Sequence, residues 1–103
     1  MGDPAAFRGV LLQAVDDGLL VASEIVRAVI YDRLQRTYQI RREEIPEKLE
    51  LFHTALRDLL GAGCEILEKL IVKNLYRRLS LDFSGHDGWT LLDNVDYAKK
   101  VQK

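Results

Sequence analysis

Apolar residues recur every three or four positions over most of the chain, which is the spacing that places side chains on one face of an α-helix. The first such stretch begins at Asp3, a suitable N-cap, and Pro4, whose missing amide hydrogen has no helical partner at the first position. Its apolar positions fall within an arc of about 140°: Phe7, Val10, Leu11, Ala14 and Val15. We predict a first helix that stops or kinks at Gly18.

A second helix is predicted from Ser23, another suitable N-cap, to a point near Tyr38. Glu24 follows the cap, where a carboxylate opposes the positive end of the helix dipole. The apolar positions spread over about half of the helix circumference: Ile25, Val26, Val29, Ile30 and Leu34. We therefore expect this helix to touch neighbours on two sides.

The segment from Ile40 to Pro46 is polar and typical of a linker, and Pro46 fits the first turn of a third helix. The apolar residues of that helix keep to a stripe of about 100°: Leu49, Phe52, Leu56, Leu59 and Leu60. Leu51 lies nearly opposite the stripe, so we expect it to be exposed. The glycine-rich turn at 61–63 ends the helix.

A fourth helix follows this turn and is apolar over about 280° of its circumference: Ile66, Leu67, Leu70, Ile71, Val72, Leu75, Tyr76 and Leu79. Such a helix lies in the centre of a bundle or at a subunit interface. The stretch from Ser80 to Gly88 is a predicted loop, because the Leu81 and Phe83 alternation is too short for a strand. A fifth helix is predicted from Trp89 to Lys100. The expected fold is all-α, a compact single domain of residues 1–103 with four to five helices.

Composition agrees with one globular domain, since 103 residues with 48% hydrophobic and 30% charged content suit a single core. The net charge of −1 argues against a dedicated nucleic-acid binder. One cysteine excludes an intrachain disulfide, which suits a reducing compartment. The sequence shows no secretory signal pattern and no apolar run of about 18 residues, so we expect a cytoplasmic protein without a membrane span.

One basic stripe stands out between Arg27 and Arg42, where five arginines face a single acid, Asp32, for a local charge of +4. Tyrosines are interleaved, and a basic stripe with aromatic residues can bind nucleic acid or an acidic partner. Its candidate binding residues are Arg33, Arg36, Arg41 and Arg42. Four glutamates between 43 and 50 could neutralise it. We favour a charged face that is solvated or internally paired over a binding patch. If the stripe is a binding patch, the alternative function is a small nucleic-acid-binding regulator.

The histidines and the cysteine are the residues that would carry chemistry. His53 lies at the rim of the third apolar stripe, so we favour a half-buried histidine over a catalytic base or phosphoacceptor. Cys64 is expected to be a small buried residue rather than a thiol activated by a helix N-terminus. His86 lies in a glycine-flanked turn and is expected to be solvated. A zinc site needs about four such ligands, or three with an open position. These three share no close spacing, so we expect no metal, no cofactor and no catalytic site.

The run from Ser23 to Leu79 resembles a small archaeal helical family of unassigned function, known from a domain regarded as the output domain of Nitrosopumilus signalling proteins. The residues that carry the resemblance are Gly18-Leu19-Leu20, Ile30-Tyr31 through Leu34, Glu43-Glu44-Ile45-Pro46, Phe52, Leu56, Leu60-Gly61-Ala62-Gly63, Ile71, Leu75-Tyr76 and Trp89. The family offers no catalytic residues to transfer. The resemblance implies a helical fold and an interaction or output module.

The leading expectation is therefore a non-enzymatic protein-interaction or signalling-output module. Its protein partner is not identified by the sequence. Self-association as a symmetric dimer is expected because two helices with wide apolar faces are hard to cover in so small a domain. The residues expected at that interface are Val72 and Tyr76. In the competing account, the fifth helix and the Leu81–Phe83 segment cover the fourth helix within the monomer.

Overall fold

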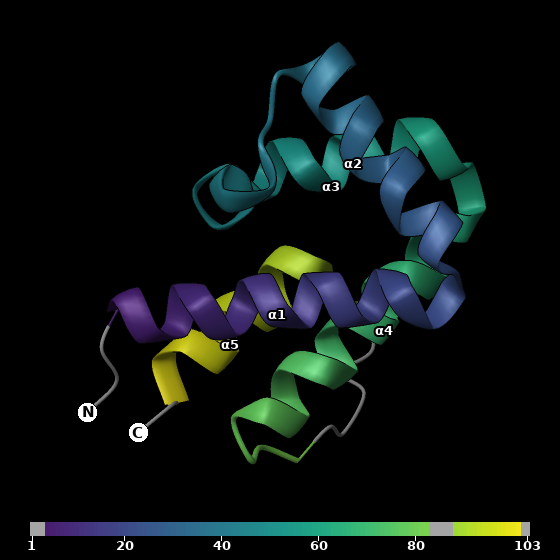
Figure 1. Cartoon of the computed structure of the whole chain (residues 1–103). Helices are drawn as coiled ribbons and strands as arrows, with labels where there is room; N and C mark the ends of the chain where they lie inside the picture. The colour runs from purple at the N-terminus through teal and green to yellow at the C-terminus, as the bar shows by residue number, and fades with distance from the viewer. Residues whose placement is uncertain (1–3, 83–87, 102–103) are drawn as a thin grey trace.

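The structure, a computed structural model, describes residues 4–82 and 88–101, with side chains described from Ala6 onward. These ranges hold five α-helices, two short 3₁₀ helices and no strand (Figure 1). The elements are α1 (Pro4–Ala22), α2 (Glu24–Tyr38), η1 (Arg42–Glu47), α3 (Leu49–Leu60), η2 (Gly61–Gly63), α4 (Cys64–Arg78) and α5 (Leu91–Val101). The predicted all-α fold is confirmed. The Asp3 cap and the predictions for Phe83 and His86 lie outside the described residues.

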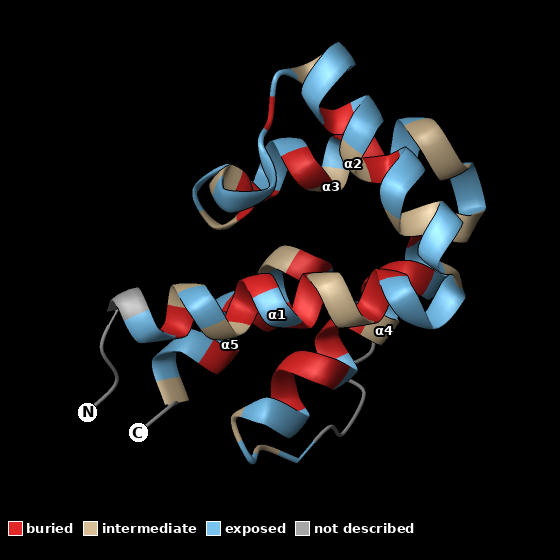
Figure 2. Cartoon of the chain, viewed as in Figure 1, coloured by how far each residue is buried: buried red, intermediate tan, exposed pale blue. Residues whose placement is uncertain are grey.

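The helices pack around α1 and α4. α1 contacts α4, α2 and η1, while α2 also contacts α3, and α5 contacts both α4 and α3. In the view of Figure 1, α2 and α3 lie above α1, most of α4 lies below it, and α5 passes behind it. The buried core draws on every α-helix (Figure 2). None of the helices in the described part of the chain is both long and apolar enough to cross a membrane.

The wide apolar surface of the fourth helix predicted either a central place in the bundle or a subunit interface. The structure places this helix in the centre. Leu67, Ile71, Val72, Leu75 and Tyr76 are all buried within the monomer. Its neighbours α1 and α5 both contact it, but Ile66, also on α4, stays 68% exposed.

The sequence suggested that the first helix stops or kinks at Gly18. The helix does not end there, because α1 continues to Ala22. The glycine instead lies where α1 packs against α4. A Cβ atom placed on Gly18 would lie 2.8 Å from the Cα atom of Ile71 and 2.7 Å from its Cγ1 atom. Gly18 is therefore a close-approach position between two helices.

The start of α2 is as predicted, and part of its apolar surface stays exposed. The Ser23 hydroxyl caps the helix by accepting hydrogen bonds from the backbone N–H groups of Ile25 (3.0 Å) and Val26 (3.3 Å). Only Ile30 and Leu34 of α2 are buried. The expectation that this helix touches neighbours on two sides is confirmed, because α2 contacts both α1 and α3. Ile25 and Val29 nevertheless stay exposed.

The segment between α2 and α3 is more ordered than a polar linker. Ile40 and Ile45 are both fully buried and anchor it to the core. The intervening η1 includes Pro46, so α3 begins later than predicted, at Leu49. The sequence prediction missed this because two isolated isoleucines among charges show no periodicity.

The remaining helix ends follow the predictions closely. Leu51 is exposed on α3, and the 61–63 turn ends that helix. α5 begins at Leu91 rather than Trp89 because Thr90 caps it. The Thr90 hydroxyl accepts a hydrogen bond from the Asp93 backbone N–H, and the Asp93 carboxylate accepts one from the Thr90 backbone N–H.

Candidate functional site

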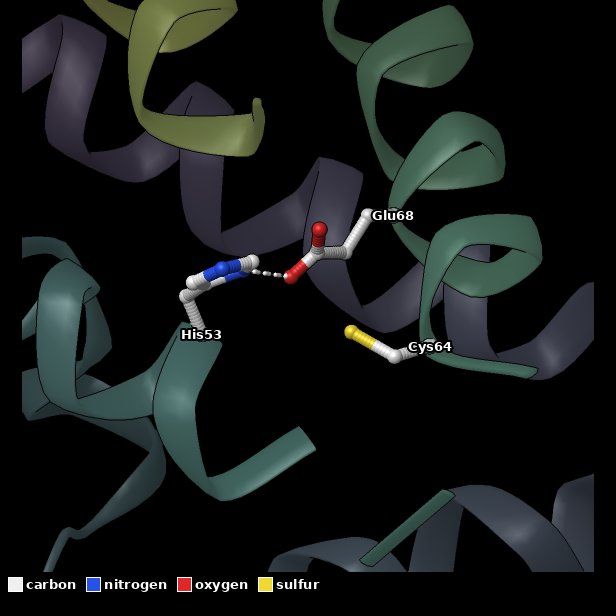
Figure 3. A group of neighbouring side chains, drawn as sticks. All are labelled: His53, Cys64 and Glu68. Carbon is white, nitrogen blue, oxygen red and sulfur yellow. Dashed lines mark hydrogen bonds and ion pairs between the residues drawn. The ribbon is translucent and has the colours of Figure 1, made fainter. Parts of the chain in front are cut away.

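Three side chains with metal-binding or catalytic chemistry meet between α3 and α4. His53 lies on α3, Cys64 is the first residue of α4, and Glu68 follows one helical turn later on the same face. The short 61–63 turn folds α4 back beside α3, which brings the histidine to the other two (Figure 3). One ligand atom from each residue lies within 4.8 Å of the others.

Nδ1 of His53 and a carboxylate oxygen of Glu68 are joined by a hydrogen bond (Figure 3). The Glu68 side chain is only 9% exposed, whereas that of His53 is 21% exposed. A buried carboxylate needs such a partner, because an unpaired charge in the interior is costly. The expectation of a half-buried rim histidine is confirmed.

Cys64 is buried and its thiol is not activated. Burial, followed by the nearby negative charge of Glu68, raises the pKa of the Cys64 thiol to about 12. The expected small buried cysteine is confirmed. The alternative, a thiol with a pKa lowered by the helix N-terminus, is wrong, because burial and the Glu68 carboxylate raise that pKa instead.

An open pocket of about 1000 Å³ adjoins the cluster, and all three residues line it. Three basic side chains, Arg57, Lys69 and Lys73, line the same pocket, together with the acidic Glu65. The pocket therefore gives a solute access to a group of nitrogen, sulfur and oxygen donors in a partly basic surrounding.

Glu68 is the member of the cluster that the sequence analysis missed. Its signal is the i, i+4 spacing from Cys64 on a helix, which places the two side chains on one face. The nearby apolar residues Leu67 and Leu70 favoured a purely hydrophobic interpretation of this part of the helix. Pairing with His53, 15 residues earlier, depends on the packing of two helices and leaves no pattern in the sequence.

Two of the four stripe arginines are engaged in ion pairs within the chain. Arg42 donates through Nε to both carboxylate oxygens of Asp16, at 2.8 and 2.9 Å. Arg36 pairs with Asp32 at 2.9 Å. Arg33 and Arg41 are exposed. These findings confirm an internally paired and solvated face for Arg36 and Arg42.

The partners of the stripe are not the glutamates expected to neutralise it. Glu44 accepts a hydrogen bond from the Arg41 backbone N–H (2.9 Å) and pairs with Lys48 at 3.4 Å. Glu47 pairs with Arg8 at 2.5 Å. The helix packing, rather than adjacency in the chain, thus decides which acids meet the arginines.

Four exposed aliphatic side chains lie at the end of α1 and on the first turns of α2, while Leu51, Ile66, Trp89 and Tyr97 are exposed elsewhere. Leu20, Val21, Ile25 and Val29 are 41%, 62%, 75% and 53% exposed. We call these four residues the corner patch; Figure 2 shows this end of α1 and of α2 as largely exposed.

The residues first expected at a subunit interface require a correction. Val72 is 3% exposed and Tyr76 is 1% exposed, because α1 and α5 cover α4 within the monomer. The Tyr76 hydroxyl also donates a hydrogen bond to the side-chain oxygen of Asn94, at 3.0 Å. Neither residue offers a surface to a second molecule.

The chain was compared with known protein families, curated proteins and solved structures. No protein-family model matches the chain, and neither a curated protein nor a solved structure matches it significantly. The resemblance to the archaeal output family therefore stays a prediction, and the geometry of the chain is what supports a function.

Proposed function

We propose that this chain is a non-enzymatic protein-interaction module that self-associates as a twofold dimer through the corner patch. The observation that supports this proposal is the gathering of four large exposed aliphatic side chains at one corner. Contiguous exposed apolar surface of this kind marks interaction sites in soluble proteins.

The corner patch is not a by-product of an unfinished core. Ile30 and Leu34 are the residues of α2 that are buried in the core. Ile25 and Val29 are therefore not needed to complete the core. Ile25 and Val29 lie one turn apart on the outer face of the helix. Leu20 and Val21 lie in the last turn of α1, which ends at Ala22, close in the chain to the start of α2.

A second copy of the chain is the occupant that best fits this surface. Asp32 and Arg36 follow on the outer face of α2 and neutralise each other as an ion pair. Arg33, one turn after Val29, is also exposed and places a positive charge at the edge of each patch. An antiparallel contact between two α2 helices would place Ile25 of one copy against Val29 of the other, and twofold closure is the commonest form of self-association.

The test is the molar mass in solution over the micromolar range, measured by light scattering. We expect a mass that approaches twice 11.8 kDa as concentration rises. Val29→Glu should restore the monomer, because it places a charge in the apolar contact. Leu51→Glu is the matched control, since Leu51 is as exposed as Leu20 but lies on α3.

A mass that stays at 11.8 kDa at every concentration would contradict the proposed dimer. Equal dissociation by Leu51→Glu would show that the contact lies elsewhere. Circular dichroism of both variants verifies that the exposed substitutions leave the helices intact.

A further inference from the structure

We propose that His53, Cys64 and Glu68 form a binding site for one Zn²⁺ ion, with the remaining coordination position open to the adjoining pocket. This inference does not depend on the dimer, because the cluster lies between α3 and α4 and shares no residue with the corner patch.

The donor atoms select the class of metal. Imidazole nitrogen, cysteine sulfur and carboxylate oxygen are the three ligand types of protein zinc sites. Mg²⁺ and Ca²⁺ prefer oxygen ligands, so a site with a thiolate and an imidazole favours zinc over them. Three protein ligands with one free position are the arrangement of an open zinc site rather than a closed structural one.

The geometry requires only small side-chain movements. The ligand atoms lie within 4.8 Å of one another. In a tetrahedral site with bonds of about 2.0–2.3 Å, ligand atoms are about 3.3–3.6 Å apart. Since no two of these atoms are more than 4.8 Å apart, coordination requires the His53–Glu68 contact to open and shifts of about 1 Å in the ligand positions.

The charges also balance. Binding breaks the S–H bond of Cys64, forms a Zn–S bond and releases the thiol proton to solvent. The thiolate and the Glu68 carboxylate together neutralise the two positive charges of the ion. His53 coordinates as neutral imidazole, and its contact with Glu68 is replaced by the shared metal.

The fourth ligand of the zinc ion comes from the pocket. Because the three ligands all line it, a water molecule or a small anion there can complete the coordination. Arg57 and Lys69 line the same pocket and favour an anion at this position.

The competing interpretation is a purely structural role, in which the His53–Glu68 pair ties α3 to α4 and Cys64 fills space. That role predicts loss of stability on substitution but no stoichiometric metal binding. Metal titration therefore separates the two.

The experiment uses tag-free full-length protein stripped with a chelator. Zn²⁺ is titrated by calorimetry, and Co²⁺ is titrated as a spectroscopic probe. We expect one ion per chain and a cobalt spectrum with a thiolate charge-transfer band in the near ultraviolet. Cys64→Ser should abolish that band. Glu68→Gln, which keeps the shape of the side chain, should weaken Zn²⁺ binding at least about tenfold, because even residues that only orient ligands contribute that much.

Glu65→Gln is the matched control, since Glu65 lines the same pocket on the next position after Cys64 but is exposed and outside the cluster. It should leave the affinity unchanged. Val29→Glu should also bind one ion, so failure of the dimer and failure of the metal site are distinguishable. Absence of stoichiometric binding, or binding that survives both Cys64→Ser and Glu68→Gln, would overturn the proposal. If Cys64→Ser does not fold, Glu68→Gln alone decides.

Discussion

At the scale of single residues, Gly18 shows how close the α1–α4 contact is. Its position leaves no room for a Cβ atom, because the neighbouring atoms belong to the backbone of Ile71 as well as to its side chain. Backbone atoms cannot rotate away, so relief would require the two helices to move apart.

We predict that Gly18→Ala destabilises the protein by about 1–3 kcal/mol, the usual cost of overpacking a core. Gly9→Ala is the matched control in the same helix, since a Cβ atom there meets nothing within 4 Å. It should stabilise by about 0.5–1 kcal/mol because alanine favours the helix. Urea unfolding measures both, and equal effects of the two substitutions would contradict the close contact.

A second prediction at this scale concerns Asp16. Burial would raise the pKa of its carboxyl group, but hydrogen bonds from Arg42 and Tyr31 outweigh burial and hold it below its ordinary value of 3.8. A lowered pKa in the folded state adds stability that is present above the unfolded value and is lost as pH falls through the folded one. The stability advantage of the wild type over Asp16→Asn should therefore shrink between about pH 5 and about pH 2.

Urea unfolding at a series of pH values measures this advantage. Asp96→Asn is the control, because Asp96 forms only an exposed surface pair with Lys100. An advantage that stays constant on acidification would show that the Asp16 pairs do not contribute in solution.

At the scale of elements, local signals in the sequence predicted where helices exist and where several of them end. Ser23 caps α2 as expected, and the 61–63 turn separates α3 from α4. What could not be predicted depends on contacts between elements. The extension of α1 past Gly18 is one case, since a close helix contact and a helix stop both favour glycine.

In the candidate site too, local features were predictable and contacts between helices were not. The burial of His53 and Cys64 followed from their positions on apolar faces. Their convergence with Glu68 did not, because it needs the relative placement of two helices. The wide apolar face of α2 was predicted to be hard to cover, but periodicity alone did not show which of its residues stay exposed.

The Ser23 cap gives the prediction at this scale. Ser23→Ala should destabilise the protein by about 1 kcal/mol, because the backbone N–H groups of Ile25 and Val26 lose their acceptor. Ser23→Asp should restore most of this loss, since aspartate is an equally good cap. Thermal unfolding of the three proteins tests it, and an alanine variant as stable as wild type would contradict the capping role.

At the scale of the whole molecule, the charge distribution bears on the alternative of a nucleic-acid-binding regulator. The chain carries a net charge of −1, and Arg36 and Arg42 are engaged in internal ion pairs. We predict no binding to duplex DNA or RNA at physiological ionic strength. Fluorescence anisotropy at several salt concentrations measures it. Binding that falls steeply with salt and disappears when Arg33, Arg36, Arg41 and Arg42 are changed to Glu would favour the alternative instead.

Self-association through the corner patch is the central claim at this scale, and contacts between two copies test it most directly. An isotope-filtered nuclear Overhauser experiment on an equal mixture of ¹³C-labelled and unlabelled protein detects only contacts between copies. We predict cross-peaks between methyl groups of Ile25 in one copy and Val29 in the other. No intermolecular peaks at millimolar concentration, or peaks confined to exposed residues elsewhere such as Leu51, would contradict the proposed interface.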